Sequence, residues 1–248
     1  MTNWKQDAGH GGKDPGAVAK GNIEKVYTLE AALYVNKRLS DHGIESECTR
    51  YKDETLDEDQ RVAKVKKFKK CMSHHFNASG GSGIEVIHSI HSDGKFEHFL
   101  IEEFRAAGYP VRSRPVFFKS LPNNPKQDFY YMHRRTGNCR TTIIEYDFVD
   151  GPQSEKIKDK AYREGMYECV VRAICRDEGV VYKPLNPKEV KSVSEQTLTP
   201  GQEAVRQEAI RLGITDGKKP FREVNQYYVW NAMIPLARRV EELEKKLK

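Results

Sequence analysis

The sequence predicts an α/β fold, with a mostly parallel twisted sheet flanked by helices and a small all-helical module at the C-terminal end. Helical and strand-like patterns alternate along the first 176 residues, as expected when helices connect parallel strands. The run TTIIEYDF at Thr141–Phe148 is β-branched and apolar, which is typical of an interior strand. Prolines and serines in residues 181–198 are typical of a linker. We therefore expect one α/β domain at 1–180, the linker at 181–198, and a helical module at 199–248.

Each expected element follows from a local pattern. The helix at Glu24–His42 has an apolar face that includes Leu29 and Leu39. The helix at 57–70 has acids in its first turn and lysines in its last, which suits the helix dipole. Four prolines between residues 110 and 125 indicate a loop-rich stretch. The remaining expected elements are strands at Asn3–Asp7, Ile44–Thr49, Cys71–His75, Ile84–Ile90 and Thr141–Phe148, and helices at 94–107 and Ser154–Arg176.

The composition suits a protein made in a reducing cytosol. Five cysteines occur among the 248 residues, and no two form a C-x-x-C pair, so neither a disulfide framework nor a cysteine zinc site is expected. The first residues, MTNWKQDAGHGG, lack the apolar core of a signal peptide, and no run is long enough to span a membrane. We predict synthesis in the cytoplasm without a signal peptide.

The net charge of +6 at pH 7 is a mild basic bias. Such a bias suits a polyanionic partner, although it also occurs as ordinary surface charge. The cluster KVKKFKK at residues 64–70 is interpreted as the solvated face of a helix. No nucleic-acid-binding motif accompanies it, so a nucleic-acid partner is not expected.

Two histidines and two glutamates are placed as amide hydrolysis requires. A zinc ion with three protein ligands activates water and stabilises an oxyanion, and a further carboxylate moves the proton to the leaving amine. His10 follows the first strand, Glu24 begins the first helix, and His75 ends a short strand. Glu145 lies in an apolar run, where an unpaired carboxylate is costly. Each alone has an ordinary explanation, but together they lie at element ends, where α/β folds place their sites.

The segment DAGHGGKDPGA, followed by Glu24–Lys25, resembles the opening motif of the zinc-dependent N-acetylmuramoyl-L-alanine amidases of amidase type 3. The resemblance covers residues 7–178. It implies zinc ligands at His10, Glu24 and His75, catalysis by Glu145, and cleavage of peptidoglycan between N-acetylmuramic acid and L-alanine. Further segments similar to this family are Thr49–Arg50 with Asp53, Arg61, Ser73–Ala78, Gly83–Glu85, and Ile144–Glu145 with Phe148.

Several assignments stay open at this point. His74 neighbours His75, and strand alternation allows only one of the two to face the site; the motif register favours His75. Asp7 is either a support for a metal ligand or a turn residue, and Asn77 is either a substrate-binding residue or a turn residue. The remaining histidines near the motifs are interpreted as surface or packing residues, namely His88, His91 and His98.

The tail after residue 180 carries 13 lysines and arginines against nine acids. Residues 203–234 resemble a helix–loop–helix of the S-layer homology type, which implies an anionic secondary cell-wall polymer as ligand. The alternative is a helical hairpin that packs its aromatic residues inward and forms a homo-oligomer through the last helix. The aromatic residues in question are Tyr227, Tyr228 and Trp230.

A catalytic domain followed by a basic module resembles a phage or prophage endolysin, which reaches the wall after holin-mediated release. A bacterial autolysin released by cell lysis fits the same arrangement. Two other functions stay open: a zinc peptidase or deacetylase that acts on another amide bond, and a cell-wall-binding protein with an inactive amidase domain. Metal-activated water attacks many acyl groups, so the ligand set alone does not separate these functions.

Overall fold

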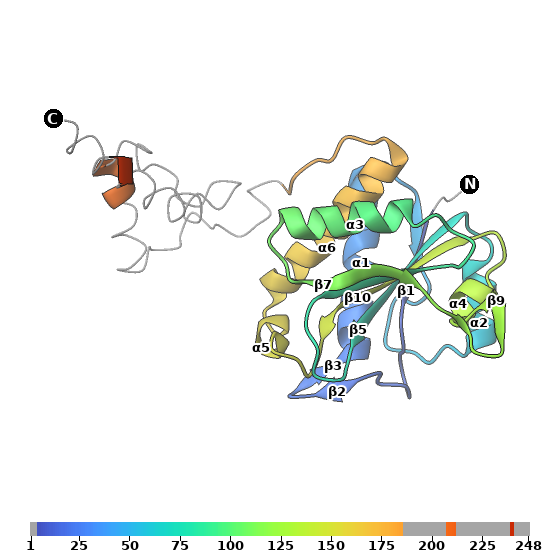
Figure 1. Cartoon of the computed structure of the whole chain (residues 1–248). Coiled ribbons are helices and arrows are strands. Elements are labelled where there is room, and N and C mark those ends of the chain that lie inside the picture. The colour runs from blue at the N-terminus through green and yellow to red at the C-terminus, as the bar shows by residue number, and fades with distance from the viewer. Residues whose placement is uncertain (1–3, 186–206, 212–238, 241–248) are drawn as a thin grey trace. The chain divides into compact units, whose positions relative to one another are not determined.

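A computed structural model of the chain describes residues 4–185, 207–211 and 239–240 (Figure 1). The chain forms two compact units, residues 1–183 and 184–248, each described by itself. In the second unit, residues 207–211 and 239–240 are helical. The rest of the predicted helical module, and all but the first five residues of the predicted linker, lie outside the described residues, so both stay predictions.

A six-stranded sheet forms the centre of the first unit, in the order β4-β1-β5-β10-β6-β7. β4, β1, β5 and β10 are mutually parallel, whereas β6 runs antiparallel to β10, and β7 is parallel to β6. This arrangement confirms the predicted α/β fold with a mostly parallel sheet. The strands are β1 (Trp4–Ala8), β4 (Ser46–Cys48), β5 (Lys70–Asn77), β6 (Ile84–His88), β7 (Val111–Phe118) and β10 (Arg140–Phe148).

Helices cover both faces of the sheet (Figure 1). Ile144 and Tyr146 of β10 point into the main core, which the long helices α1 (Glu24–Asp41), α3 (Lys95–Ala106) and α6 (Lys160–Glu178) complete. Ile143, one residue earlier than Ile144, faces the opposite side, because successive strand residues alternate. There it joins a smaller apolar cluster beneath α2 (Glu58–Val65) and α4 (Tyr131–Arg134), which contains Val65, Cys71, Ile87, Met132, Cys139 and Ile143.

The proline-rich stretch that was predicted to be a loop instead forms β7 and a hairpin of β8 (Ser120–Leu121) and β9 (Asn124–Asp128). The prediction was wrong because Pro115 lies in an edge strand, where a missing N–H breaks no ladder. The pairing of β6 with β7 also shifts register between Ile84 and Val86, which accommodates the extra residues of β7.

Other helices differ from the predicted ones in where they begin and end. The helix predicted for Ser154–Arg176 is interrupted: α5 covers Ser154–Ile157, and Asp159 then caps α6 by accepting a hydrogen bond from the Ala161 N–H at 2.9 Å. The helix predicted for 57–70 ends at Val65, because β5 begins at Lys70. Two very short strands, β2 (Val18–Ala19) and β3 (Asn22–Ile23), form a hairpin immediately before α1.

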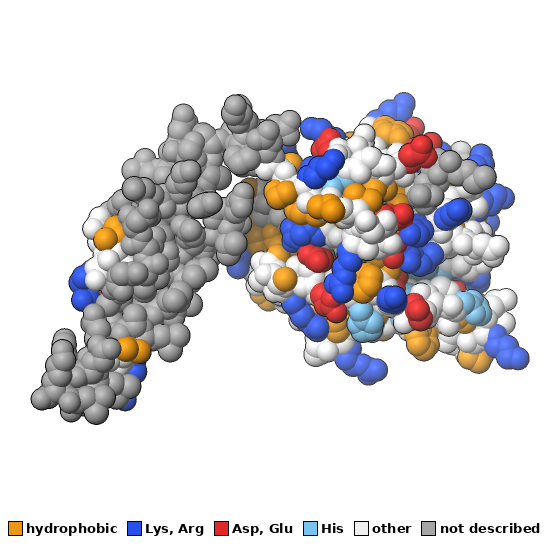
Figure 2. Space-filling view, turned by 90° about the horizontal axis from the view of Figure 1, so that it is seen from above, with side chains coloured by type: hydrophobic (Ala, Val, Ile, Leu, Met, Phe, Trp, Pro, Cys, Tyr) orange, Lys and Arg blue, Asp and Glu red, His pale blue; other side chains and the backbone are white. Residues whose placement is uncertain are grey.

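Lysine and arginine side chains are interspersed with acidic ones on the face that Figure 2 shows. Two lysines of the basic cluster at 64–70 make contacts within the fold. Lys64 donates a hydrogen bond to the Thr49 carbonyl at 2.8 Å, and Lys70 forms an ion pair with Asp177 at 2.8 Å. All five cysteines are free and buried. Within the described part of the chain, no helix is both long and apolar enough to cross a membrane.

Candidate metal centre

His10, Glu24 and His75 come from three different elements and converge at one point. His10 lies in the loop after β1, Glu24 is the first residue of α1, and His75 lies near the end of β5. Their ligand atoms all lie within 4.8 Å of one another, and no other such group occurs among the described residues. Glu24 Oε1 is 3.1 Å from His10 Nε2 and 3.0 Å from His75 Nδ1.

These spacings suit a small tetrahedral metal ion. Zinc binds nitrogen and oxygen at about 2.0–2.1 Å, so tetrahedral ligands lie roughly 3.3 Å apart. Burial raises the pKa of Glu24, but hydrogen bonds from His10 and His75 outweigh it, and the net pKa is lowered. The carboxylate is therefore ionised at neutral pH. Its Oε2 accepts the Ala17 N–H at 2.8 Å and its Oε1 the Phe76 N–H at 3.0 Å, which fix its orientation.

Two buried arginines hold the loop that carries His10. Arg61 donates to the carbonyls of Ala8 at 2.6 Å and His10 at 2.8 Å. Arg50 donates to the carbonyl of Gly9 at 3.0 Å. These contacts stabilise the left-handed backbone of His10, whose φ is 59°. The arginines that resemble family positions in the sequence therefore act by shaping the loop.

Close packing explains the glycines of this loop. A Cβ on Gly16 would lie 2.5 Å from Glu24 Oε2 and 2.7 Å from His10 Cδ2, and its φ of +64° is also left-handed. Gly12 donates its N–H to Asp53 Oδ1 at 2.7 Å, and Lys25 Nζ donates to the Gly12 carbonyl at 2.8 Å. The motif glycines thus let the backbone approach the candidate ligands.

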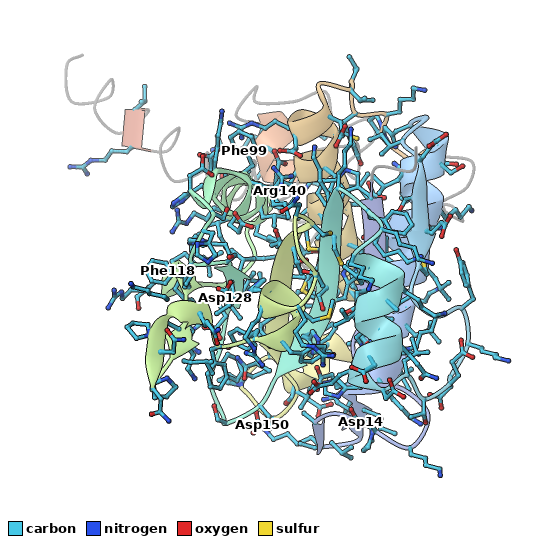
Figure 3. The ribbon with its side chains drawn as sticks, turned by 90° about the vertical axis from the view of Figure 1, so that its right-hand side faces the viewer. Asp14, Phe99, Phe118, Asp128, Arg140 and Asp150 are labelled. Carbon is cyan, nitrogen blue, oxygen red and sulfur yellow. The ribbon has the colours of Figure 1, made fainter. Side chains whose placement is uncertain are left out.

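Asp14 belongs to this centre, although it is not among the site residues predicted from the sequence. Its Oδ2 lies 2.8 Å from His10 Nδ1, and its Oδ1 accepts the Gly16 N–H at 3.0 Å. Metal-bound histidines commonly donate their second ring N–H to a carboxylate in this way, which directs the other nitrogen at the metal. The spacing of four residues after His10 in the glycine-rich loop was the available signal. Figure 3 shows Asp14 at the same end of the unit as Asp150, which follows β10.

An Asp14→Ala variant is expected to weaken metal binding by about 10–100-fold, because His10 loses the acceptor that orients its ring. Metal affinity, measured by competition with a chelator, checks this. The matched control is Asp93→Ala, which removes an exposed carboxylate that accepts the Lys95 N–H at 3.0 Å at a different place in the fold. Equal affinities in Asp14→Ala and the unsubstituted chain would contradict a supporting role for Asp14.

The structure separates His75 from His74. His74 is fully buried on the core side of β5, where its Nδ1 lies 2.9 Å from the Tyr146 hydroxyl and its Nε2 lies 3.1 Å from Gln6 Oε1. Burial lowers the pKa of His74 to about 3, so its ring is neutral at pH 7. His75, which alternation turns to the other face, is the histidine that joins His10 and Glu24.

Glu145 lies beside the candidate ligands on the same face of the sheet. In the strand register it is opposite His75 of β5 and Glu85 of β6. Its Oε2 is buried and has no hydrogen-bond partner. Burial, and then the negative charges of Glu24 and Glu85, raise the pKa of Glu145 well above the ordinary 4.5. A raised pKa makes the Glu145 carboxylate a stronger proton acceptor than an ordinary glutamate.

Asn77 and Asp7 have structural partners. Asn77 Nδ2 donates to Glu85 Oε1 at 2.8 Å, and Arg112 Nε pairs with Glu85 Oε2 at 2.8 Å, so Asn77 helps to hold Glu85. Asp7 pairs with Arg61 at 2.6 Å and accepts hydrogen bonds from Thr49 and Ser73. It supports the His10 loop through Arg61 and makes no hydrogen bond to a candidate ligand. The other histidines considered from the sequence, His88, His91 and His98, lie outside the metal cluster.

Comparisons with known proteins show what this chain is similar to. A family described as N-acetylmuramoyl-L-alanine amidase matches residues 7–176. The uncharacterized protein YqiI of Bacillus subtilis is 25% identical over 176 residues, which are 68% of this chain and 81% of YqiI. The probable cell wall amidase LytH of Staphylococcus epidermidis is 23% identical over 169 residues, and the match spans 66% of this chain but only 54% of LytH.

Solved structures have the same fold. The catalytic domain of CwlV, an N-acetylmuramoyl-L-alanine amidase from Bacillus (Paenibacillus) polymyxa var. colistinus, matches with a TM-score of 0.64 and 24% identity, over 73% of this chain and all of that domain. Cwp6 from Clostridium difficile matches with a TM-score of 0.63 and 26% identity, over 73% of this chain and 29% of Cwp6. The family match covers more than half of the chain, including every candidate site residue. The chain therefore belongs to the N-acetylmuramoyl-L-alanine amidase family.

Proposed function

We propose that this protein is a zinc-dependent peptidoglycan hydrolase that cleaves the amide bond between N-acetylmuramic acid and L-alanine. The observation that carries the proposal is the convergence of His10, Glu24 and His75 beside the half-buried Glu145, in a chain of this family. Two histidines and one glutamate are a ligand set of catalytic zinc, which leaves a fourth position open for water or substrate.

In this mechanism His10, Glu24 and His75 would hold the zinc ion, which would supply a Lewis acid and a water of lowered pKa. Glu145 accepts a proton as the water attacks the carbonyl carbon, and it returns that proton to the amide nitrogen as the C–N bond breaks. The products are a free lactyl carboxylate on the sugar and a free amino group on L-alanine. The raised pKa of Glu145 favours the first of these transfers, the uptake of the proton.

Product analysis tests the proposal against its rivals. Digested peptidoglycan is expected to contain intact glycan strands and stem peptides with free L-alanine amino termini, which mass spectrometry identifies. Metal analysis of the same preparation is expected to find one zinc ion per chain. New reducing sugar ends would indicate a glycosidase, and cleavage at another amide bond would indicate a peptidase or deacetylase. Binding to walls without any released product would indicate an inactive amidase domain.

The proposal extends to the rest of the chain. We assign residues 181–198 to a linker and residues 199–248 to a helical module that binds an anionic cell-wall polymer. The supporting observations are the basic charge of the tail and the separation of residues 184–248 as a compact unit. A lytic endolysin role, release through a holin or by cell lysis, and association of two chains through the last helix stay predictions from the sequence.

A further inference from the structure

Three side chains lead from the metal centre towards the edge of the sheet. In the strand register, Glu145 of β10 is opposite His75 of β5 on one side and Glu85 of β6 on the other. Neighbouring strands lie about 4.8 Å apart, and register partners point to the same face. Arg112 of the edge strand β7 continues this line, because its Nε lies 2.8 Å from Glu85 Oε2. The metal centre, Glu145, Glu85 and Arg112 therefore follow one another across the sheet.

The Arg112 guanidinium is fixed by two contacts. It lies 5.1 Å from the centroid of the Phe148 ring, and it pairs with Glu85, whose other oxygen accepts a hydrogen bond from Asn77 at 2.8 Å. The Arg112 side chain is nevertheless 39% exposed, and the structure gives its two terminal nitrogens no hydrogen-bond partner among the described residues. The guanidinium is therefore held in one place while part of it remains accessible to a ligand.

Arg112 brings a positive charge to a line of side chains that otherwise carries carboxylates. Glu145 and Glu85, its two predecessors on this line, would both repel an anionic group of a substrate. An arginine has five N–H donors in a planar fork that matches a carboxylate, so a guanidinium that pairs with one carboxylate through Nε can bind a second. An anionic group of the substrate is therefore accommodated at Arg112 and at neither glutamate.

The proposed reaction gives the direction in which the substrate crosses these side chains. Glu145 returns a proton to the scissile nitrogen, which belongs to L-alanine, so this nitrogen must come within hydrogen-bond reach of Glu145. The carbonyl side of the bond, with the sugar, then lies towards the metal centre, and the stem peptide runs on towards Glu85 and Arg112. Two residues of extended peptide span about 7 Å. This length is similar to one strand spacing from Glu145 to Glu85 followed by the 2.8 Å from Glu85 to Arg112.

We propose that Arg112 determines specificity by binding the α-carboxylate of the second stem-peptide residue when that residue is a γ-linked D-glutamate. In peptidoglycan this group is either a free carboxylate or a neutral carboxamide, and only the carboxylate makes a charge-assisted, bidentate pair with a guanidinium. The protein then prefers stem peptides with the free carboxylate. This inference rests on the proposed amidase function, which supplies the substrate and its direction.

The test compares two soluble N-acetylmuramoyl-peptide fragments that differ only in this group, a carboxylate in one and a carboxamide in the other. We expect the full, zinc-loaded chain to have a kcat/KM about 10–100-fold higher for the carboxylate fragment, mainly through a lower KM. Arg112→Gln should lose this preference by falling to the carboxamide value on both fragments. Arg112→Lys keeps the charge without the planar fork, so it should retain part of the preference.

Direct binding gives a readout that does not depend on turnover. The probe is the dipeptide L-alanyl-γ-D-glutamate, and its affinity, measured by calorimetry, should fall by about 10–100-fold in Arg112→Gln. The matched control is Arg176→Gln. Arg176 of α6 has the same two kinds of contact, an ion pair with Glu102 at 2.6 Å and the Phe99 ring at 3.9 Å from its centroid. Figure 3 shows Phe99 at the end of the unit away from Asp14, so this control should keep both the affinity and the preference.

The outcomes separate this inference from the proposed function. Equal kcat/KM on the two fragments in the unsubstituted chain, or a preference for the carboxamide, would overturn the role of Arg112. An equal loss on both fragments in Arg112→Gln would also overturn it, since Arg112 would then only support Glu85. If the unsubstituted, zinc-loaded chain released no peptide from either fragment, the proposed amidase function would fail instead, and dipeptide binding would still test Arg112.

Discussion

A Glu145→Gln variant is expected to keep its fold and its metal and to hydrolyse peptidoglycan about 10²–10⁴-fold more slowly than the unsubstituted chain. The amide has nearly the same shape as the carboxyl group but accepts no proton at neutral pH. Because Glu145 Oε2 is buried and has no hydrogen-bond partner, removal of the charge of this carboxyl group is not expected to lower stability. The measurements are initial rates of peptide release, zinc content and melting temperature.

Glu155→Gln is the control for this substitution. Glu155 lies on α5 in an exposed pair with Lys158, so the same chemical change there is expected to leave turnover unaltered. Loss of zinc from Glu145→Gln would make Glu145 a ligand instead of the general base. Unchanged turnover in Glu145→Gln would remove Glu145 from the mechanism.

The same substitution has a signature in the pH profile. The general base must be deprotonated, so the rate falls as the pH falls through the pKa of Glu145. Burial, and then the charges of Glu24 and Glu85, raise that pKa in the metal-free site, whereas the positive charge of a bound zinc ion would lower it, so the midpoint of this acidic loss measures the balance of these effects. The residual activity of Glu145→Gln should lack this loss. If both proteins lost activity at low pH with the same midpoint, that loss would belong to a group other than Glu145.

His75→Gln and His74→Gln are expected to have opposite effects on metal binding. His75→Gln removes a candidate ligand, so zinc affinity should fall by more than the roughly 10–100-fold that loss of a supporting residue causes. His74→Gln changes a fully buried ring on the other face, and zinc should stay bound. It instead disturbs the hydrogen bonds to Tyr146 and Gln6, which we expect to cost about 1–3 kcal/mol of stability.

Melting curves with and without zinc distinguish the two variants. A ligand that binds only the folded state raises the melting temperature, so zinc should stabilise His74→Gln and leave His75→Gln unaffected. Hydrolysis of cell walls, followed as loss of turbidity, should persist in His74→Gln and disappear in His75→Gln. Chelation of the unsubstituted chain should abolish this hydrolysis, and added zinc should restore it. Zinc retention by His75→Gln, or zinc loss from His74→Gln, would contradict the assignment.

Local sequence patterns predicted those strands and helices whose own residues are sufficient to specify the secondary structure. The apolar run at Thr141–Phe148 and the apolar face of the first helix correspond to β10 and α1 with small changes at their ends. Local sequence patterns gave the wrong secondary structure where the position of a segment in the sheet decides it. Pro115 is tolerated in β7 only because that strand is at the edge of the sheet, and strand order is not encoded in any local window.

The sequence by itself determined which residue types are available for the chemistry and the family to which they belong: His10, Glu24, His75 and Glu145 stand in motifs of fixed spacing. Tertiary structure alone decided which side chains meet. Strand register places Glu145 between His75 and Glu85, and the alternation of β5 turns His74 into the core. The physical reason is that a side chain's direction is set by its backbone, whereas its neighbours are set by pairing and packing across the whole sheet.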